Sequence, residues 1–77
     1  MNPPTFTRGE RVLIKHHGQT YAAEVLLASS NGYSLALGYD GMIAGHVCVL
    51  PVLWDDATEA FRTIVGAEAV GVLRVLQ

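Results

Sequence analysis

Two side chains near the middle of the sequence offer a nitrogen and a sulfur to a metal ion. His46 and Cys48 are separated by one residue, so in a β-strand both would lie on the same face. With His16 or His17 they would supply the nitrogen and sulfur donors that zinc prefers. Structural zinc sites usually combine two paired ligand motifs, and the sequence shows none. We therefore expect ordinary strand packing for His46 and Cys48, no metal site and no cofactor.

Catalytic roles for the cysteine and the acidic residues have less support. A nucleophilic Cys48 would need a histidine base and an electropositive setting, whereas a free cysteine commonly packs as a small hydrophobic side chain. Asp55 and Asp56 are adjacent carboxylates, but neighbouring side chains diverge, and a helix-capping role already accounts for one of them. The sequence contains no GxGxxG, Walker or GxSxG motif. It therefore predicts no catalytic residue.

The aromatic side chains are the remaining candidates for a binding surface. Tyr21, Tyr33 and Tyr39 could stack on bases or line a groove for a small molecule, although packing in a core or at its rim is the commoner use. Trp54 is likewise expected to have a packing role, in which its ring closes one end of a barrel. The candidate surface for a ligand or partner therefore comprises Tyr21, Tyr33, Tyr39, His46, Cys48, Leu50 and Trp54.

Length and composition indicate one small domain. The chain has 77 residues, of which 51% are hydrophobic and 16% are charged. This apolar fraction excludes a disordered chain and predicts that another subunit covers part of the surface. The single cysteine excludes an intrachain disulfide and favours a reducing compartment. Without a signal-peptide pattern or a long apolar run, we expect a cytoplasmic protein that is not bound to a membrane.

The net charge of −2 counts against a dedicated nucleic-acid binder, because Lys and Arg side chains that neutralise phosphates supply most of the affinity for nucleic acid. Arg8, Arg11 and Lys15 lie close together in the sequence, beside His16 and His17, and would make one edge of the domain locally positive. A Tudor- or KOW-like nucleic-acid or ribonucleoprotein binder is therefore retained as an alternative.

Alternating apolar residues between turn signals predict strands. Asn31-Gly32 and Asp40-Gly41 are typical of type I′ hairpin turns, Gly18 permits a turn before them, and Pro51 is expected to end strand pairing. In the second strand, Tyr21, Ala23, Val25 and Leu27 are expected to share a face. The expected strands cover residues 11–16, 21–27, 33–39, 42–50 and 70–76.

The fourth expected strand is apolar on both faces. If Val47 and Val49 face the core, alternation sends His46, Cys48 and Leu50 to the opposite face. A contiguous apolar patch on so small a domain usually marks a contact site. We therefore expect a homo-oligomer that uses this second face, with a small molecule or another protein as a further candidate partner. In the alternative, the C-terminal segment of the same chain folds back over the strand.

The segment after Trp54 carries conflicting signals. Asp56 and Glu59 resemble a capping box and predict a short helix over 57–65, although the β-branched residues 63–65 favour a strand. We expect a mostly β fold, a small SH3-like barrel of about five antiparallel strands. Residues 1–8 would form a flexible arm with Phe6 as its anchor, and residues 9–77 would form a single domain.

Several short motifs follow one another in a recognisable order: Phe6 to Val12 (FTRGERV), Tyr21, Gly32-Tyr33 and Val47 to Val52 (VCVLPV). In this order, residues 6–54 resemble the plasmid-encoded type II dihydrofolate reductases, which are small SH3-like barrels. The resemblance implies that four barrels assemble around a central pore that binds dihydrofolate and NADPH together.

The strand that carries Gln-Ile-Tyr in that family has Cys48-Val49-Leu50 here, and the position of the family's lysine falls on Ile14, next to Lys15. Without those polar side chains, a pore would lack the donors that orient folate and nicotinamide. The resemblance therefore bears on architecture more than on activity. We expect a small non-enzymatic SH3-like binding module, with an NADPH-dependent dihydrofolate reductase-like enzyme as an alternative.

Overall fold

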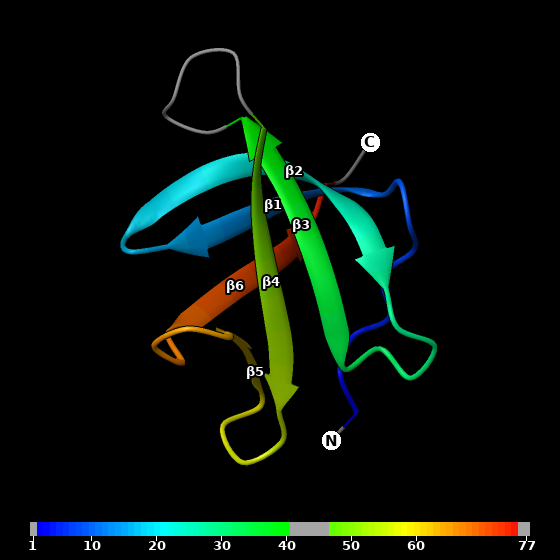
Figure 1. Ribbon diagram of the computed structural model, residues 1–77, viewed down its shortest axis with the longest axis vertical. Helices are drawn as coiled ribbons and strands as arrows, with labels where there is room; N and C mark the ends of the chain where they lie inside the picture. The colour runs from blue at the N-terminus through cyan, green and yellow to red at the C-terminus, as the bar shows by residue number, and fades with distance from the viewer. Residues whose placement is uncertain (1, 41–46, 76–77) are drawn as a thin grey trace.

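The computed structural model describes residues 2–40 and 47–75, which form a closed antiparallel β-barrel. Each strand pairs with the next along the chain, and the last strand pairs with the first (Figure 1). The predicted small, mostly β barrel is confirmed, with six strands instead of five. None of the described residues belongs to a helix that could cross a membrane. The strands are β1 (Arg11–His16), β2 (Gln19–Ala28), β3 (Ser34–Asp40), β4 (Val47–Asp55), β5 (Ala60–Thr63) and β6 (Ala69–Arg74).

The core lies inside the barrel and follows the alternation of side chains along each strand. The predicted pattern of β1 is confirmed, because Val12 and Ile14 are buried. In β3, Leu35 and Leu37 are buried. Strand alternation gives each strand one inward face, and closure of the sheet covers these faces on all sides. The buried core comprises Phe6, Val12, Ile14, Ala23, Val25, Leu35, Leu37, Val52, Phe61 and Val70.

The segment before β1 contributes to this core. Phe6 is 5% exposed, and its ring centroid lies 6.3 Å from that of Phe61 in β5. The guanidinium of Arg74 in β6 lies 4.7 Å from the Phe6 ring centroid, and its Nε donates a hydrogen bond to Glu10 Oε2 at 2.9 Å. A cation over an aromatic ring and an ion pair both stabilise such an arrangement. These contacts join the residues ahead of β1 to the last strand.

A β-bulge changes which residues of β2 face outward. The register shifts between Val25, opposite Leu37, and Leu27, opposite Ala36. The prediction that Leu27 shares a face with Ala23 and Val25 is therefore wrong, since those two residues are buried and the Leu27 side chain is 62% exposed. A bulge inserts an extra residue and reverses the alternation beyond it, and nothing in the apolar sequence of β2 indicates its position.

The predicted faces of β4 are reversed. Val49 was expected in the core and is 57% exposed, whereas Leu50 and Trp54 pack against the core and Val52 is buried. Both faces of this strand are apolar, so alternation alone does not show which of them is inward. The expected outward face containing Leu50 therefore points inward.

Strand pairing does not end at Pro51, because β4 continues to Asp55 and Pro51 lies opposite Ala36. The N–H of Trp54 donates to Tyr33 O at 2.7 Å, on the β3 side of the strand. Backbone N–H groups alternate sides along a strand. The missing N–H of Pro51 therefore falls on the side away from β3, where no ladder hydrogen bond is lost.

The helix predicted over 57–65 is wrong. Residues 56–59 form a turn, and β5 follows with Phe61 and Thr63 in a strand, whereas Ile64 and Val65 lie in the next turn. Asp55 caps this turn, since its Oδ1 accepts the N–H of Ala57 at 3.0 Å and its Oδ2 accepts the hydroxyl of Thr58 at 2.8 Å. Phe61 is 3% exposed and Thr63 is 8% exposed, so the alternation of a buried strand overrides the local capping signal.

The Asn31-Gly32 pair joins two antiparallel strands as predicted, but not as a type I′ turn. Residues 29–33 connect β2 to β3, and the N–H of Gly32 donates to Ser29 O at 3.0 Å. Gly32 has a φ of +78°, whereas Asn31 is not among the positive-φ residues and type I′ requires both. Asn31 Oδ1 instead accepts the N–H of Tyr33 at 3.0 Å. The Asp40-Gly41 turn lies outside the described residues.

The backbone of Gly32 generates a stability prediction. A Cβ at this position would lie 3.5 Å from Pro3 Cγ, which is an ordinary contact, so the cost of a side chain comes from the left-handed backbone. A β-branched residue there should cost about 1–2 kcal/mol. We expect Gly32→Val to lower the free energy of unfolding by this amount in urea denaturation, and Gly32→Asn to lose less. Equal stabilities of Gly32→Val and wild type would contradict the turn geometry.

Candidate functional site

The tip of the β1–β2 hairpin brings two consecutive histidines onto one side of the chain. His17 and Gly18 form the two-residue connection, with φ values of +53° and +74°, as a type I′ turn requires. Side chains of successive strand residues would point to opposite faces. Because the backbone of His17 is left-handed, the rings of His16 and His17 instead stack, with centroids 3.9 Å apart and planes 25° apart.

A carboxylate from the far end of the sequence joins these histidines. Glu68 lies between the β5–β6 turn and β6, and pairing of β6 with β1 brings it to the hairpin tip. His16 Nε2 lies 3.8 Å from Glu68 Oε1, and His17 Nε2 is hydrogen-bonded to Glu68 Oε2. The hydrogen bond from His17 is the main cause that lowers the pKa of Glu68 below its usual value.

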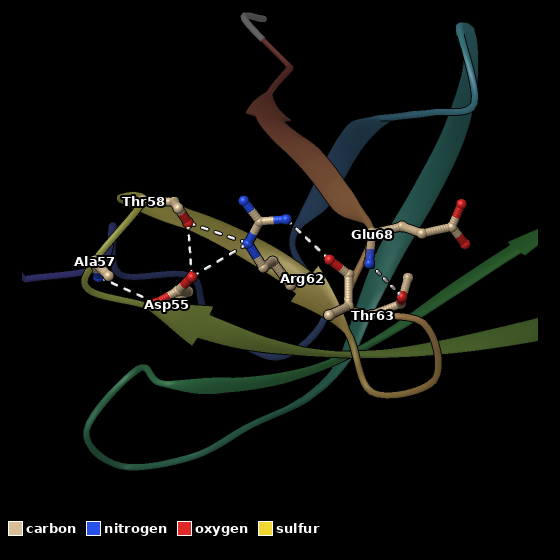
Figure 2. Close-up of polar contacts among 7 residues, drawn as sticks. Asp55, Ala57, Thr58, Arg62, Thr63 and Glu68 are labelled. Carbon is tan, nitrogen blue, oxygen red and sulfur yellow. Dashed lines mark hydrogen bonds and ion pairs between the residues drawn. The ribbon is translucent and has the colours of Figure 1, made fainter.

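The β5–β6 turn holds Glu68 through its backbone. Thr63 Oγ1 accepts the N–H of Glu68 at 3.0 Å, and Glu68 O accepts the N–H of Thr63 at 2.9 Å. The hydroxyl of Thr63 also donates a hydrogen bond to Val65 O at 2.7 Å. Figure 2 shows Thr63 and Glu68 meeting across the turn. The Glu68 backbone is therefore fixed, while its side chain reaches outward.

Arg62 links this turn to the neighbouring hairpin. Its Nη1 donates to Ala67 O at 2.8 Å, and its Nε donates to Asp55 Oδ2 at 3.2 Å and to Thr58 Oγ1 at 3.1 Å (Figure 2). The hydroxyl of Thr58 is the largest cause that lowers the pKa of Asp55, ahead of the N–H of Ala57 and the charge of Arg62. Two turns of the barrel are thereby tied together by one side chain.

A pocket of about 310 Å³ opens beside His16 and Glu68. It exists because β5 is short and pairs with β4 only from Val52 onward. Its size is at the lower limit for small-molecule sites, which typically combine apolar walls with a few polar groups. Its other lining residues are Leu50, Pro51, Thr63, Ile64 and Val65.

The predicted surface residues do not lie in one place. Tyr21 and Tyr39 meet with ring centroids 5.2 Å apart, and Cys48 pairs with Tyr39 across the sheet. Burial is the main cause that raises the pKa of Tyr39, with smaller contributions from Cys48 and Tyr21. Tyr39 also lines a second pocket of about 280 Å³ that includes Arg11 and Glu24.

Tyr33 and Trp54 are grouped elsewhere, around the carboxylate of Asp56. The Tyr33 hydroxyl donates to Asp56 Oδ2 at 3.0 Å, and Trp54 Nε1 donates to Asp56 Oδ1 at 2.9 Å. The hydrogen bond to Asp56 is the main cause that raises the pKa of Tyr33. Trp54 also packs edge-on against Phe61, with ring centroids 5.0 Å apart. Of the remaining predicted residues, Leu50 lines the pocket beside His16, and His46 lies outside the described residues.

Sequence reasoning considered His16 and His17 as ligands beside His46 and Cys48, and it missed Glu68. Glu68 is 51 residues away from His17, and their contact depends on barrel closure. The available signals were the His-His-Gly order at a hairpin tip and an acidic residue directly before the closing strand. These two signals indicate a contact between Glu68 and the histidines only when the pairing of β6 with β1 is known.

Comparisons with protein-family models, with curated proteins and with solved structures find no match to this chain. The class is therefore defined by architecture alone. Residues 2–40 and 47–75 form a small, all-β, six-stranded closed barrel, and this architecture is consistent with an SH3-like fold.

The Asp55 network generates a prediction on acid stability. Because the folded state lowers the pKa of Asp55 below its ordinary value of 3.8, the stability that this carboxylate contributes is present above that value and is lost as the pH falls through the folded-state pKa. We expect Asp55→Asn to have a lower Tm than wild type at neutral pH, and the two Tm values to converge in acid. In a Thr58→Ala background, the Tm difference between the protein with Asp55 and its Asp55→Asn variant at neutral pH should be smaller, because the hydrogen bond from Thr58 to Asp55 is lost. A Tm difference that stays constant down to strongly acidic pH would contradict this role of Asp55.

Proposed function

We propose that the protein is a non-enzymatic, SH3-like interaction module that associates with itself through the outer face of β2, β3 and β4. The observation that carries the proposal is the exposure of large apolar side chains on this face. Leu27, Val49 and Leu53 are 62%, 57% and 47% exposed. Contiguous apolar surface on a small domain is typical of a contact site.

Strand register makes these side chains neighbours. Leu27 lies opposite Ala36, which lies opposite Pro51, so the three form a row across the sheet with neighbouring Cβ atoms about 5 Å apart. Leu26 extends the row, since its Cδ1 would lie 2.8 Å from a Cβ at Gly38. We call this set the outer apolar face. It comprises Leu26, Leu27, Ala36, Val49, Pro51 and Leu53.

Charged residues lie beside the outer apolar face. Glu24 is opposite Gly38 in the register, and Arg62 is opposite Leu53. Glu24 forms an ion pair with Arg11 at 3.8 Å. An apolar centre with a polar rim is the usual anatomy of a protein–protein interface.

A second copy of the chain is the partner that we propose. The chain is 51% hydrophobic, and Leu27, Val49 and Leu53 remain exposed on the barrel. An isologous contact between two such faces would cover this surface. The resemblance to type II dihydrofolate reductases, whose barrels assemble, supports the same choice. Self-association was expected from the sequence through His46, Cys48 and Leu50. His46 lies outside the described residues, and the packing of Leu50 against the core moves the proposed interface to the opposite face of β4.

Catalysis and nucleic-acid binding have less support. Cys48, Val49 and Leu50 replace the polar residues that a reductase pore would need. Of the five basic residues of the chain, Arg11, Arg62 and Arg74 are in ion pairs with carboxylates. Such pairing leaves little free positive charge for phosphates. We therefore place a cytoplasmic interaction role ahead of both.

The outer apolar face generates a prediction on oligomeric state. Val49→Asp and Leu53→Asp should each convert the protein to a smaller species in light scattering, with the β-sheet circular dichroism spectrum retained, because a charge at the interface resists desolvation. Val65→Asp is the matched control, since Val65 is 85% exposed and lies on the β5–β6 turn. Leu50→Asp is unsuitable because Leu50 packs against the core.

Two results would contradict the proposal. One is a wild-type protein that is monomeric at high micromolar concentration. The other is dissociation by Val65→Asp to the same extent as by Val49→Asp, since the effect would then be independent of the outer apolar face.

A further inference from the structure

We infer that His16, His17 and Glu68 form a binding site for a divalent transition-metal ion, with zinc as the ion that fits best. The inference goes beyond the proposed interaction role and does not depend on it. Each residue offers one ligand atom, and the three ligand atoms all lie within 4.8 Å of one another. Zinc–nitrogen and zinc–oxygen bonds are about 2.0–2.2 Å long. Rotation of the side chains, including rotation of the imidazole rings out of their stacked arrangement, would therefore bring the three atoms onto one ion.

The first supporting observation is a buried nitrogen without a partner. Among the residues that the structure describes, His16 Nε2 is the buried side-chain polar atom that has no hydrogen bond. The nearest carboxylate oxygen, Glu68 Oε1, is 3.8 Å away, which is too far for a hydrogen bond. Buried polar atoms nearly always have a partner. A metal ion between His16 and Glu68 would satisfy this nitrogen.

The second observation is the left-handed backbone of His17, with a φ of +53°. Asn or Gly is the usual residue at the first position of a type I′ turn. Here the left-handed conformation has a definite effect, because it stacks the two imidazoles on one side of the hairpin. Both rings then reach the same carboxylate.

The donor set selects the class of ion. Two imidazoles and one carboxylate suit zinc and other first-row transition metals, whereas magnesium and calcium prefer oxygen ligands alone. The bonds between Thr63 and the backbone of Glu68 hold the main chain of Glu68 beside the hairpin tip.

Three protein ligands leave one position of a tetrahedral zinc ion open. The pocket of about 310 Å³ is lined by both His16 and Glu68, with Leu50 and Ile64 among its apolar walls. The fourth ligand would therefore be water or one polar atom of a small molecule whose apolar part lies in the pocket. This arrangement is that of an open metal site, since closed structural zinc sites take all four ligands from the protein.

The test is the response of the full chain to metal ions after treatment with EDTA. We expect Zn²⁺ to raise the Tm with saturation at one ion per chain, because an ion that binds only the folded state stabilises it, and Mg²⁺ to have no effect. Co²⁺ should develop visible absorption on binding and lose it when Zn²⁺ is added. Isothermal titration calorimetry with Zn²⁺ gives the dissociation constant.

Variants locate the site. His17→Asn keeps a residue suited to the turn, so it should fold without metal, yet its zinc affinity should fall by at least about tenfold, as should that of Glu68→Gln. Glu24→Gln removes a carboxylate elsewhere on the barrel, and Cys48→Ser removes the thiol. Both should keep wild-type zinc affinity.

The inference is overturned if Zn²⁺ changes neither Tm nor the Co²⁺ spectrum. It is overturned equally if His17→Asn binds zinc as tightly as wild type, or if Cys48→Ser is the variant that loses binding. The oligomeric state of His17→Asn separates the two proposals. It should match that of wild type whether or not zinc binds, because His17 is not part of the outer apolar face.

Discussion

Pairing of β6 with β1 is the constraint on which the rest of the structure depends. A chain of 77 residues has no second layer with which to cover a sheet, so it buries one face by closing the sheet on itself, which also pairs most of the strand edges. At this seam, Gly71 lies opposite Lys15, and a Cβ on Gly71 would lie 3.4 Å from the Cβ of Lys15. Arg74, in the same strand, holds Phe6 and Glu10 against the barrel. The seam also brings Glu68 to the two histidines.

Closure of the sheet buries its inner face but leaves two other regions of the barrel open to solvent. The first is the outer apolar face of β2, β3 and β4. The second is the pocket beside His16, which is open because β5 reaches only as far as Val52 on its neighbour. The pocket therefore depends on the shortness of β5.

Sequence reasoning predicted what depends on local pattern and missed what depends on packing. The strand around Val12 and Ile14 and the closing strand were predictable, because alternation and turn residues act over a few positions. The inward face of β4 was not, because both of its faces are apolar, and the bulge before Leu27 leaves no signal in an apolar strand. The capping residues after Trp54 predicted a helix that the burial of Phe61 overrides. The contact between Glu68 and the histidines required the closed topology.

Pro51 determines how a second copy can approach. On the side of β4 away from β3, the pairing with β5 in the described residues begins at Val52. The part of β4 before Val52 therefore has a free edge on that side, to which a strand of another molecule could add. The backbone alternation set by Trp54 and Tyr33 directs the missing N–H of Pro51 toward that side. An added strand would therefore lose a ladder hydrogen bond there. Pro51 also belongs to the outer apolar face, where its ring adds apolar surface without needing a backbone partner. The same residue thus disfavours association by strand addition and favours packing of one sheet face against another.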